Sequence, residues 1–462
     1  MTHHQRLILV WTVSLGCTPA PATSDTSDSQ GETSDETGAD TRSDDESSSG
    51  STASSEEGGT SGTSTTSSSS TSSSTGTSTS SASTDPGTST SSGTSTTGTD
   101  TTSTTEGDES VSGEDGPETG DPFDAPFILG ADISSVHENN YTFRDTDGQT
   151  KSIFDLLKNH GFNYIRVKAF VDPSAPYGYA STSNGCSGFP EPFSDRDHVV
   201  AFGQQIKAAG MGFLLNFHYS DVWADPGNQI IPDPWRDNAN IEALAEDVHA
   251  YTTDVVRTAV MAGARPDMVQ IGNEITPGML MHVPGPNTDC WGNNPAQAPF
   301  GGAANDANWG NLATLLNAGI DAVRAIDPTI KIMLHIENTD ELEGVRWWVD
   351  SALSHGVDFD VLGLSCYAAF QGPPSVWETT FEALAAEYAD LEFVVAEYNP
   401  ERTAANLMMR DLPDGRGLGT FLWEPTRGGE WGNSMFTQEG NTLVANPSDF
   451  AEFDTLRAQL GL

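Results

Sequence analysis

Two glutamate residues in the second half of the chain each follow directly after a short apolar segment. Glu274 ends residues 270–274, and Glu397 comes directly after residues 394–396. Such a pair suits hydrolysis of a glycosidic bond: one carboxyl donates a proton to the leaving oxygen, while the other stays ionised and attacks the anomeric carbon. A single strand-end Glu is better explained as a solvated loop residue. The two together favour catalysis of glycoside hydrolysis.

Polar and aromatic side chains at the ends of other apolar segments are candidates to bind the substrate or support the two carboxyls. We expect Arg166 to hold one carboxylate ionised, Asn273 to hydrogen-bond a sugar hydroxyl, and Trp423 to offer a flat face to a sugar ring. The other candidates are His218, Asp221, His335 and Tyr367. Taken alone, His218 fits a buried core histidine, and the motif around it favours a functional role; His335 is evenly balanced between the two.

Eight apolar segments separated by amphipathic stretches would position these residues. Four of them follow a Gly that would end a helix in the left-handed conformation: Gly161, Gly210, Gly263 and Gly356. The expected strands are 127–133, 164–167, 213–217, 268–271, 330–336, 359–364, 393–396 and 419–423. Their nearly continuous apolar character is typical of a parallel sheet buried on both faces. The pattern predicts an α/β fold, a TIM (β/α)8 barrel over residues 127–462, with the site at the carboxyl ends of its strands.

Composition separates this region from the rest of the chain. The chain has 462 residues and a formal net charge of −46, which excludes a nucleic-acid-binding protein. Residues 18–126 are nearly all Ser, Thr, Gly, Asp, Glu and Pro, with Arg42 as their one basic residue. Such a segment has too little apolar surface to offset the entropy of ordering. We expect a disordered low-complexity linker before the barrel.

The first residues predict export. His3, His4 and Arg6 precede an apolar run over residues 7–16, as in a secretory signal, and the run is too short to span a membrane. It ends in Ser14-Leu15-Gly16-Cys17, which resembles a bacterial lipobox with Leu displaced by one position. We expect residues 1–17 to be a signal peptide with Cys17 as a lipid anchor, the only link to a membrane. Ordinary secretion is the alternative, so the protein is either a bacterial cell-surface lipoprotein or secreted.

The other three cysteines differ in their surroundings. Cys186 and Cys290 lie in loop-like sequence rich in Gly and Pro, and export permits a disulfide between them. Cys366 lies in an apolar segment and is expected to be a buried thiol. With no CxxC or HxxxH motif, we expect neither a zinc site nor any required cofactor. We expect a monomer.

Longer motifs resemble glycoside hydrolase family 53, the endo-β-1,4-galactanases that cut the galactan side chains of pectin. The residues that carry the resemblance are 216–227 (NFHYSDVWADPG), 269–275 (VQIGNEI), 359–365 (FDVLGLS), 130–135 (GADISS) and 164–167 (YIRV). The resemblance extends from about Gly130 to Phe436. It implies a TIM barrel and a retaining mechanism, with Glu274 as acid/base and Glu397 as nucleophile.

The chain departs from this family around the nucleophile. Tyr398-Asn399-Pro400 follows Glu397 in place of the usual Thr, small residue, Tyr and Pro, and Cys366 and Ala368 replace a Tyr and a Pro. These departures leave two alternatives open: the same chemistry on another β-1,4-glycan such as mannan or xylan, or a non-catalytic sugar-binding surface lipoprotein. Calcium binding, which occurs in some relatives, also stays open because no run of Asp and Asn follows the seventh strand.

Overall fold

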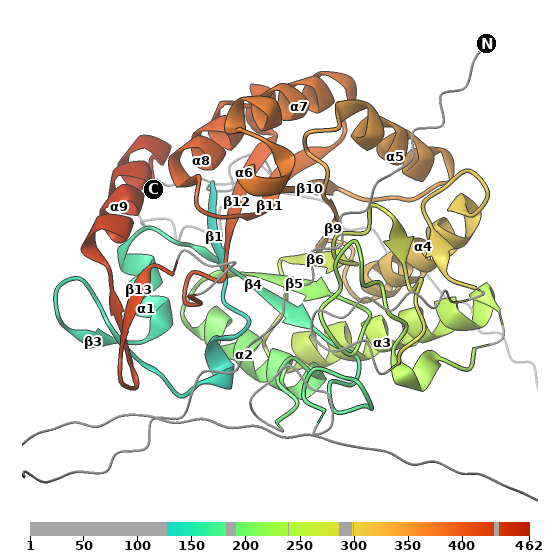
Figure 1. The fold of residues 1–462 in the computed structure, drawn as a ribbon, viewed down its shortest axis with the longest axis horizontal. Coiled ribbons are helices and arrows are strands. Elements are labelled where there is room, and N and C mark those ends of the chain that lie inside the picture. The colour runs from blue at the N-terminus through green and yellow to red at the C-terminus, as the bar shows by residue number, and fades with distance from the viewer. Residues whose placement is uncertain (1–126, 182–190, 239, 286–297, 299, 429–433) are drawn as a thin grey trace, which may run out of the picture. The chain divides into compact units, whose positions relative to one another are not determined.

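The computed structural model describes residues 127–181, 191–238, 240–285, 298, 300–428 and 434–462 (Figure 1). The expected signal peptide and linker, residues 1–126, lie outside these residues and stay predictions. No helix in the described part of the chain is long and apolar enough to cross a membrane.

A closed barrel of eight parallel strands forms the centre of the fold, as predicted. The strands are paired in the order β1-β12-β11-β10-β9-β6-β5-β4, and β4 pairs with β1 to close the barrel. Their bounds are β1 Ile128–Asp132, β4 Tyr164–Ala169, β5 Gly212–Phe217, β6 Met268–Ile271, β9 Lys331–Ile336, β10 Val361–Cys366, β11 Glu392–Tyr398 and β12 Gly417–Trp423. All eight expected strands are therefore present, with ends that shift by a few residues.

Helices surround the barrel (Figure 1). They are α1 Ile153–Asn159, α2 Arg196–Ala208, α3 Ile241–Met261, α4 Trp309–Ile326, α5 Leu342–Ser354, α6 Ala368–Gln371, α7 Pro374–Glu387, α8 Arg402–Asp411 and α9 Pro447–Leu460, with short 3-10 turns at Val136–Glu138, Asp233–Trp235 and Pro413–Gly415. Asp195 caps α2 by accepting the N–H of His198, and Asn240 caps α3 in the same way. The four Gly residues expected at helix ends all have positive φ, between 68° and 93°.

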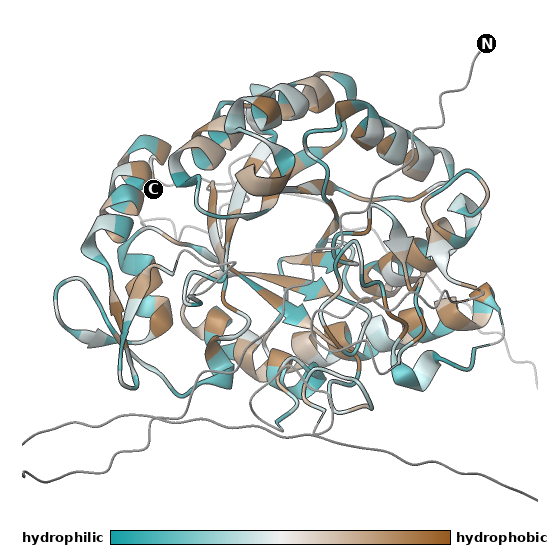
Figure 2. Ribbon diagram, in the orientation of Figure 1, coloured by the Kyte–Doolittle hydropathy of each residue, from teal (hydrophilic) through white to brown (hydrophobic). Residues whose placement is uncertain are grey.

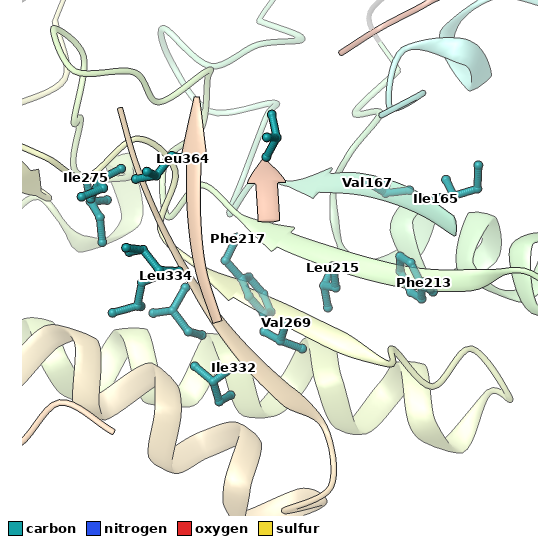
Figure 3. Close-up of a cluster of buried hydrophobic side chains, with 14 of the residues drawn as sticks. Ile165, Val167, Phe213, Leu215, Phe217, Val269, Ile275, Ile332, Leu334 and Leu364 are labelled. Atoms are coloured by element: carbon teal, nitrogen blue, oxygen red, sulfur yellow. The ribbon is translucent and has the colours of Figure 1, made fainter. Parts of the chain in front are cut away.

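The alternation of side chains along each strand divides the core into two layers. Leu214, Met268 and Met333 pack inside the barrel, while Ile165, Val167 and their equivalents pack between the strands and the helices. Figure 3 shows part of that outer layer, with Phe217 and Ile332 among the labelled residues. Figure 2 shows brown and teal residues alternating along the surrounding helices, as expected for helices with one buried face. Residues between the outward-facing positions, such as Arg166, therefore point into the barrel.

Two small sheets were not predicted from the sequence. One has the strand order β13-β14-β2-β3, with bounds Phe436–Glu439, Thr442–Ala445, Thr142–Arg144 and Thr150–Lys151. The other pairs β7 Gly278–Met279 with β8 Gly302–Ala303. The parallel pairing of β14 with β2 joins segments about 300 residues apart in the chain, so no local pattern indicates it.

Candidate active site

The two candidate carboxyls lie at the carboxyl ends of barrel strands, where a TIM barrel places its active site. Glu397 is near the end of β11 and is buried, whereas Glu274 follows β6 after two residues and is partly exposed. Glu274 has a φ of +48°, a strained conformation for a residue with a side chain. The fold therefore holds this carboxyl at the strand end against a local preference.

Glu397 receives a hydrogen bond on each carboxylate oxygen. Arg166 Nη1 donates to Oε1 at 2.7 Å, and the Tyr367 hydroxyl donates to Oε2 at 3.0 Å. Burial and the charge of Asp132 raise the pKa of Glu397, and the Arg166 charge and the two donated bonds oppose that rise. Because both oxygens act as acceptors, this environment favours the ionised carboxylate. Arg166 therefore lies beside a carboxylate, as expected, and Tyr367, a candidate to bind the substrate or support the carboxyls, donates to the same group.

Glu274 has the opposite surroundings. Burial raises its pKa well above the usual value, and the nearby charges of Glu397 and Glu337 raise it further. The Ser365 hydroxyl donates to Glu274 Oε1 at 2.7 Å. The two carboxyls therefore differ in their neighbours. A guanidinium and a hydroxyl donate to Glu397, whereas other acids face Glu274, and this difference favours the proton on Glu274.

Arg166 is the centre of a buried hydrogen-bond network. Its Nη1 also contacts Asp132 at 3.0 Å, Nε donates to Gln270 at 3.1 Å, and Nη2 donates to Asn273 Oδ1 at 2.7 Å. Asn273 in turn donates to the Ala224 carbonyl at 2.8 Å. The second amide N–H of Asn273 has no bond within this network, and the expected bond from Asn273 to a sugar hydroxyl stays a prediction. Asp132 serves the network as a partner of Arg166.

The structure places His218 and His335 in different surroundings. His218 Nδ1 accepts the Ala224 N–H at 2.9 Å and Nε2 lies 3.1 Å from Asn216, so neither nitrogen contacts a candidate carboxyl. His335 Nε2 lies 2.9 Å from Ser365, the residue that donates to Glu274. Burial and the Arg166 charge lower the pKa of both imidazoles well below the usual value, which keeps them neutral.

Asp221 joins loops and does not contact the carboxyl pair. Its two oxygens accept the backbone N–H groups of Asp172 at 2.8 Å and Asp233 at 2.7 Å. Of the two roles expected for it, binding substrate or supporting the site, these bonds favour support.

Trp423, the last residue of β12, belongs to an aromatic cluster beside the carboxyls. Its ring centroid lies 6.3 Å from that of Trp223, and Tyr367 packs against the same cluster. Lys168 Nζ lies 4.0 Å from the centroid of the Trp223 ring and 3.8 Å from a Glu138 oxygen. The cation holds Trp223 in place, and Trp223 in turn supports Trp423.

The sequence assigned no role to three other polar residues of this site. Gln270 bonds Arg166, Ser365 bonds Glu274, and Glu424 accepts both the backbone N–H and the hydroxyl of Ser135. Burial and the charge of Asp132 raise the pKa of Glu424 to about 7. A polar residue at an inward-facing position of an otherwise apolar strand is the signal that would have assigned a role to Gln270.

The cysteine and metal predictions are tested only in part. Cys366 is a buried free thiol, as expected, and burial raises its pKa. Cys17, Cys186 and Cys290 lie outside the described residues, so the anchor and the disulfide stay predictions. Among the described residues, no three His, Cys, Asp or Glu side chains are grouped to hold a metal ion.

Comparison with known proteins identifies the family. The model of glycosyl hydrolase family 53 matches residues 128–407. The endo-beta-1,4-galactanase of Bacillus subtilis (strain 168) is 29% identical, over 65% of this chain and 70% of the relative. An arabinogalactan endo-beta-1,4-galactanase of Thermothelomyces thermophilus is 28% identical, over 68% of this chain and 96% of the relative.

Solved structures agree with this match. A structure from a study of two fungal beta-1,4-galactanases superposes with a TM-score of 0.56 at 26% identity, covering 71% of this chain and 99% of that one. The likeness therefore extends over nearly the whole of a known barrel.

Proposed function

The chain belongs to glycosyl hydrolase family 53, and on that premise we propose that it is an endo-acting β-1,4-galactanase that cleaves the galactan side chains of pectin with retention of configuration. The observation that carries the proposal is the contrast between the two carboxyls. Glu397 has a donor on each oxygen, including a guanidinium at 2.7 Å, and Glu274 is surrounded by other acids. Retaining glycosidases require this division between one ionised and one protonated carboxyl.

The first half of the reaction uses the two carboxyls together. A Glu397 oxygen attacks the anomeric carbon, the bond from that carbon to the leaving oxygen breaks, and the Glu274 proton passes to that oxygen. Arg166 and Tyr367 hold the Glu397 carboxylate in place for the attack. The products are a galactosyl ester of Glu397 and a shortened galactan chain.

In the second half, water restores the enzyme. The Glu274 carboxylate removes a proton from the water as the water oxygen attacks the anomeric carbon, and the ester bond to Glu397 breaks. The result is a free reducing end with its original configuration, an ionised Glu397 and a protonated Glu274. Trp423 supplies the apolar face against which the sugar ring packs.

The test compares glycans and variants of the full chain. We expect β-1,4-galactan, and neither mannan, xylan nor cellulose, to yield reducing ends, with the β-anomer formed first in an NMR time course. Glu274→Gln and Glu397→Gln should lose nearly all activity on galactan while keeping the circular-dichroism spectrum of the wild type. Cleavage of mannan or xylan alone would establish the alternative substrate, and binding without cleavage would establish the non-catalytic alternative. No feature of the site favours either alternative.

We further propose that the chain is exported as a monomer and tethered through Cys17. The support is the lipobox-like sequence at residues 14–17 and the Ser- and Thr-rich composition of residues 18–126. A linker of that length has a root-mean-square reach of roughly 50 to 60 Å, enough to hold the barrel away from a membrane surface. A disulfide between Cys186 and Cys290 belongs to the same proposal and is tested by mass spectrometry of non-reduced peptides.

A further inference from the structure

One oxygen of Glu274 is already occupied by a protein donor. The Ser365 hydroxyl donates to Oε1 at 2.7 Å, and His335 Nε2 lies 2.9 Å from the same hydroxyl. Ser365 is the last inward-facing residue of β10, and His335 lies on β9. Both side chains are fully buried. The roles derived above for the two carboxyls assign nothing to either residue.

The direction of these hydrogen bonds follows from the other side of the His335 ring. Asn273 Oδ1 already accepts three N–H donors, from Arg166 at 2.7 Å, Gln270 at 3.1 Å and Asn216 at 3.2 Å. His335 Nδ1 also lies 3.1 Å from this oxygen. Because three N–H donors already occupy the two lone pairs of Oδ1, we assign no proton to Nδ1 for a fourth bond to it.

Two of these same donors also lie near His335 Nδ1. Gln270 Nε2 is 3.3 Å and Arg166 Nη2 is 3.5 Å from His335 Nδ1. Nδ1 is thus the acceptor of the ring, and the one proton of a neutral imidazole is on Nε2. His335 then donates to Ser365, and the Ser365 proton is directed to Glu274.

We propose that His335 and Ser365 are positioning residues for the acid/base Glu274, which fix its transferable proton on Oε2 by occupying Oε1 as an acceptor. Glu274 Oε1 accepts the Ser365 hydrogen bond, so Oε1 has no proton that points toward Ser365. The carboxyl proton of Glu274 therefore lies on Oε2. The proposal rests on the function proposed above for Glu274.

The same arrangement serves both halves of the reaction. After Glu274 has given its proton to the leaving oxygen, Ser365 still donates to Oε1 and stabilises the carboxylate. Oε2 then remains free to accept the proton of the attacking water. His335 and Ser365 keep their own protons in both halves of the reaction. They therefore orient Glu274 without taking part in the proton transfer.

Ser365 also opposes the charges that face Glu274. These come from Glu397 on β11, Glu337 after β9 and Asp225 after β5, all of which raise the pKa of Glu274, and the Ser365 hydrogen bond lowers it. Tyr367 after β10 faces the same two carboxyls. Removing the Ser365 hydroxyl therefore moves the alkaline limb of the pH profile to higher pH, since activity requires a protonated Glu274.

The test compares Ser365→Ala with the wild type on two substrates, galactan and a dinitrophenyl β-galactobioside. The first has a poor leaving group that needs the proton, whereas dinitrophenolate leaves without one. We expect kcat/KM on galactan to fall about 10- to 100-fold and kcat/KM on the activated substrate to change much less, as for an impaired general acid. The alkaline limb should move upward, and Ser365→Thr, which keeps a hydroxyl, should restore both properties.

Thr380→Val is the matched control. Thr380 lies on α7, and its buried hydroxyl donates to the Thr339 carbonyl at 2.7 Å. The variant therefore removes a hydrogen bond of the same length as the one from Ser365 without touching Glu274. If Ser365→Ala does not fold, Ser365→Cys gives the same comparison, because a thiol of similar volume is a weak donor.

Two outcomes overturn the assignment and are distinguishable. If the wild type cleaves galactan but Ser365→Ala loses activity equally on both substrates, or keeps the wild-type alkaline limb, the positioning role is wrong and the proposed function stands. If the wild type cleaves no β-1,4-glycan, the proposed function fails and the assignment fails with it.

Discussion

Replacing Tyr367 by Phe tests whether hydrogen bonding keeps Glu397 ionised. The change removes the hydroxyl that donates to Glu397 Oε2 at 3.0 Å and keeps the ring that packs against the aromatic cluster. A hydrogen bond to a charged group is worth about 1.5 to 3 kcal/mol. At 1.36 kcal/mol per pKa unit, that energy corresponds to a rise of about 1 to 2 units in the pKa of Glu397.

The structure favours the lower end of this range. Arg166 continues to donate to the other oxygen at 2.7 Å, and the Tyr367 side chain is not fully buried, so water can replace part of the lost bond. We therefore expect a rise of about 1 unit. Because Glu397 must be ionised to attack, the acid limb of kcat/KM moves by that amount to higher pH, and activity at low pH falls about tenfold.

The assay is hydrolysis of galactan by the full chain at a series of pH values within the range in which the fold persists. Tyr388→Phe is the matched control, because the Tyr388 hydroxyl also donates to a carboxylate, Asp350 at 2.9 Å, but lies between α5 and the end of α7. An acid limb that stays in place in Tyr367→Phe, or that moves equally in Tyr388→Phe, would refute the reasoning.

Three further predictions concern stability and location. Asp221→Asn leaves one of two backbone N–H groups without an acceptor, because the amide has a single oxygen. It should lower the free energy of unfolding by about 1 to 3 kcal/mol in denaturant titration while kcat/KM on galactan stays near that of the wild type. A loss of activity without a loss of stability would contradict the loop-joining role. Lys151, His160 and Asn159 hold the pKa of Asp145 well below its usual range, so the stabilisation by Asp145 is present above the unfolded value of about 4 and is lost as pH falls below it. The stability difference between wild type and Asp145→Asn should therefore shrink on acidification, and a difference independent of pH would show that the charge is irrelevant. Cys17→Ser should move the protein from the membrane fraction to the soluble fraction of the expressing bacterium, and an unchanged distribution would exclude the lipid anchor.

Much of the barrel was predictable because its signals are local. A strand buried on both faces must be apolar along its whole length, and a helix that turns back toward the barrel needs a residue that adopts positive φ. These two requirements located all eight strands and the Gly residues at 161, 210, 263 and 356. The same reasoning brought Glu274 and Glu397 to one end of the barrel, because parallel strands share a direction.

The roles of individual side chains depended on contacts across the barrel. His218 and His335 both follow apolar segments, yet His335 contacts Ser365 and His218 contacts a backbone N–H and Asn216. Asp221 was a candidate for substrate binding or support, and its two oxygens are occupied by loop N–H groups.

The sequence by itself determined the strand pattern, the family motifs and the pair of glutamates, because burial and turn geometry constrain residue types over a few neighbouring positions. The tertiary structure decided which glutamate is paired with a cation. Arg166 reaches Glu397 across 231 residues of sequence, and Ser365 reaches Glu274 across 91. The difference in pKa between the two carboxyls arises from distances of about 3 Å between side chains on different strands, and only closure of the barrel sets those distances.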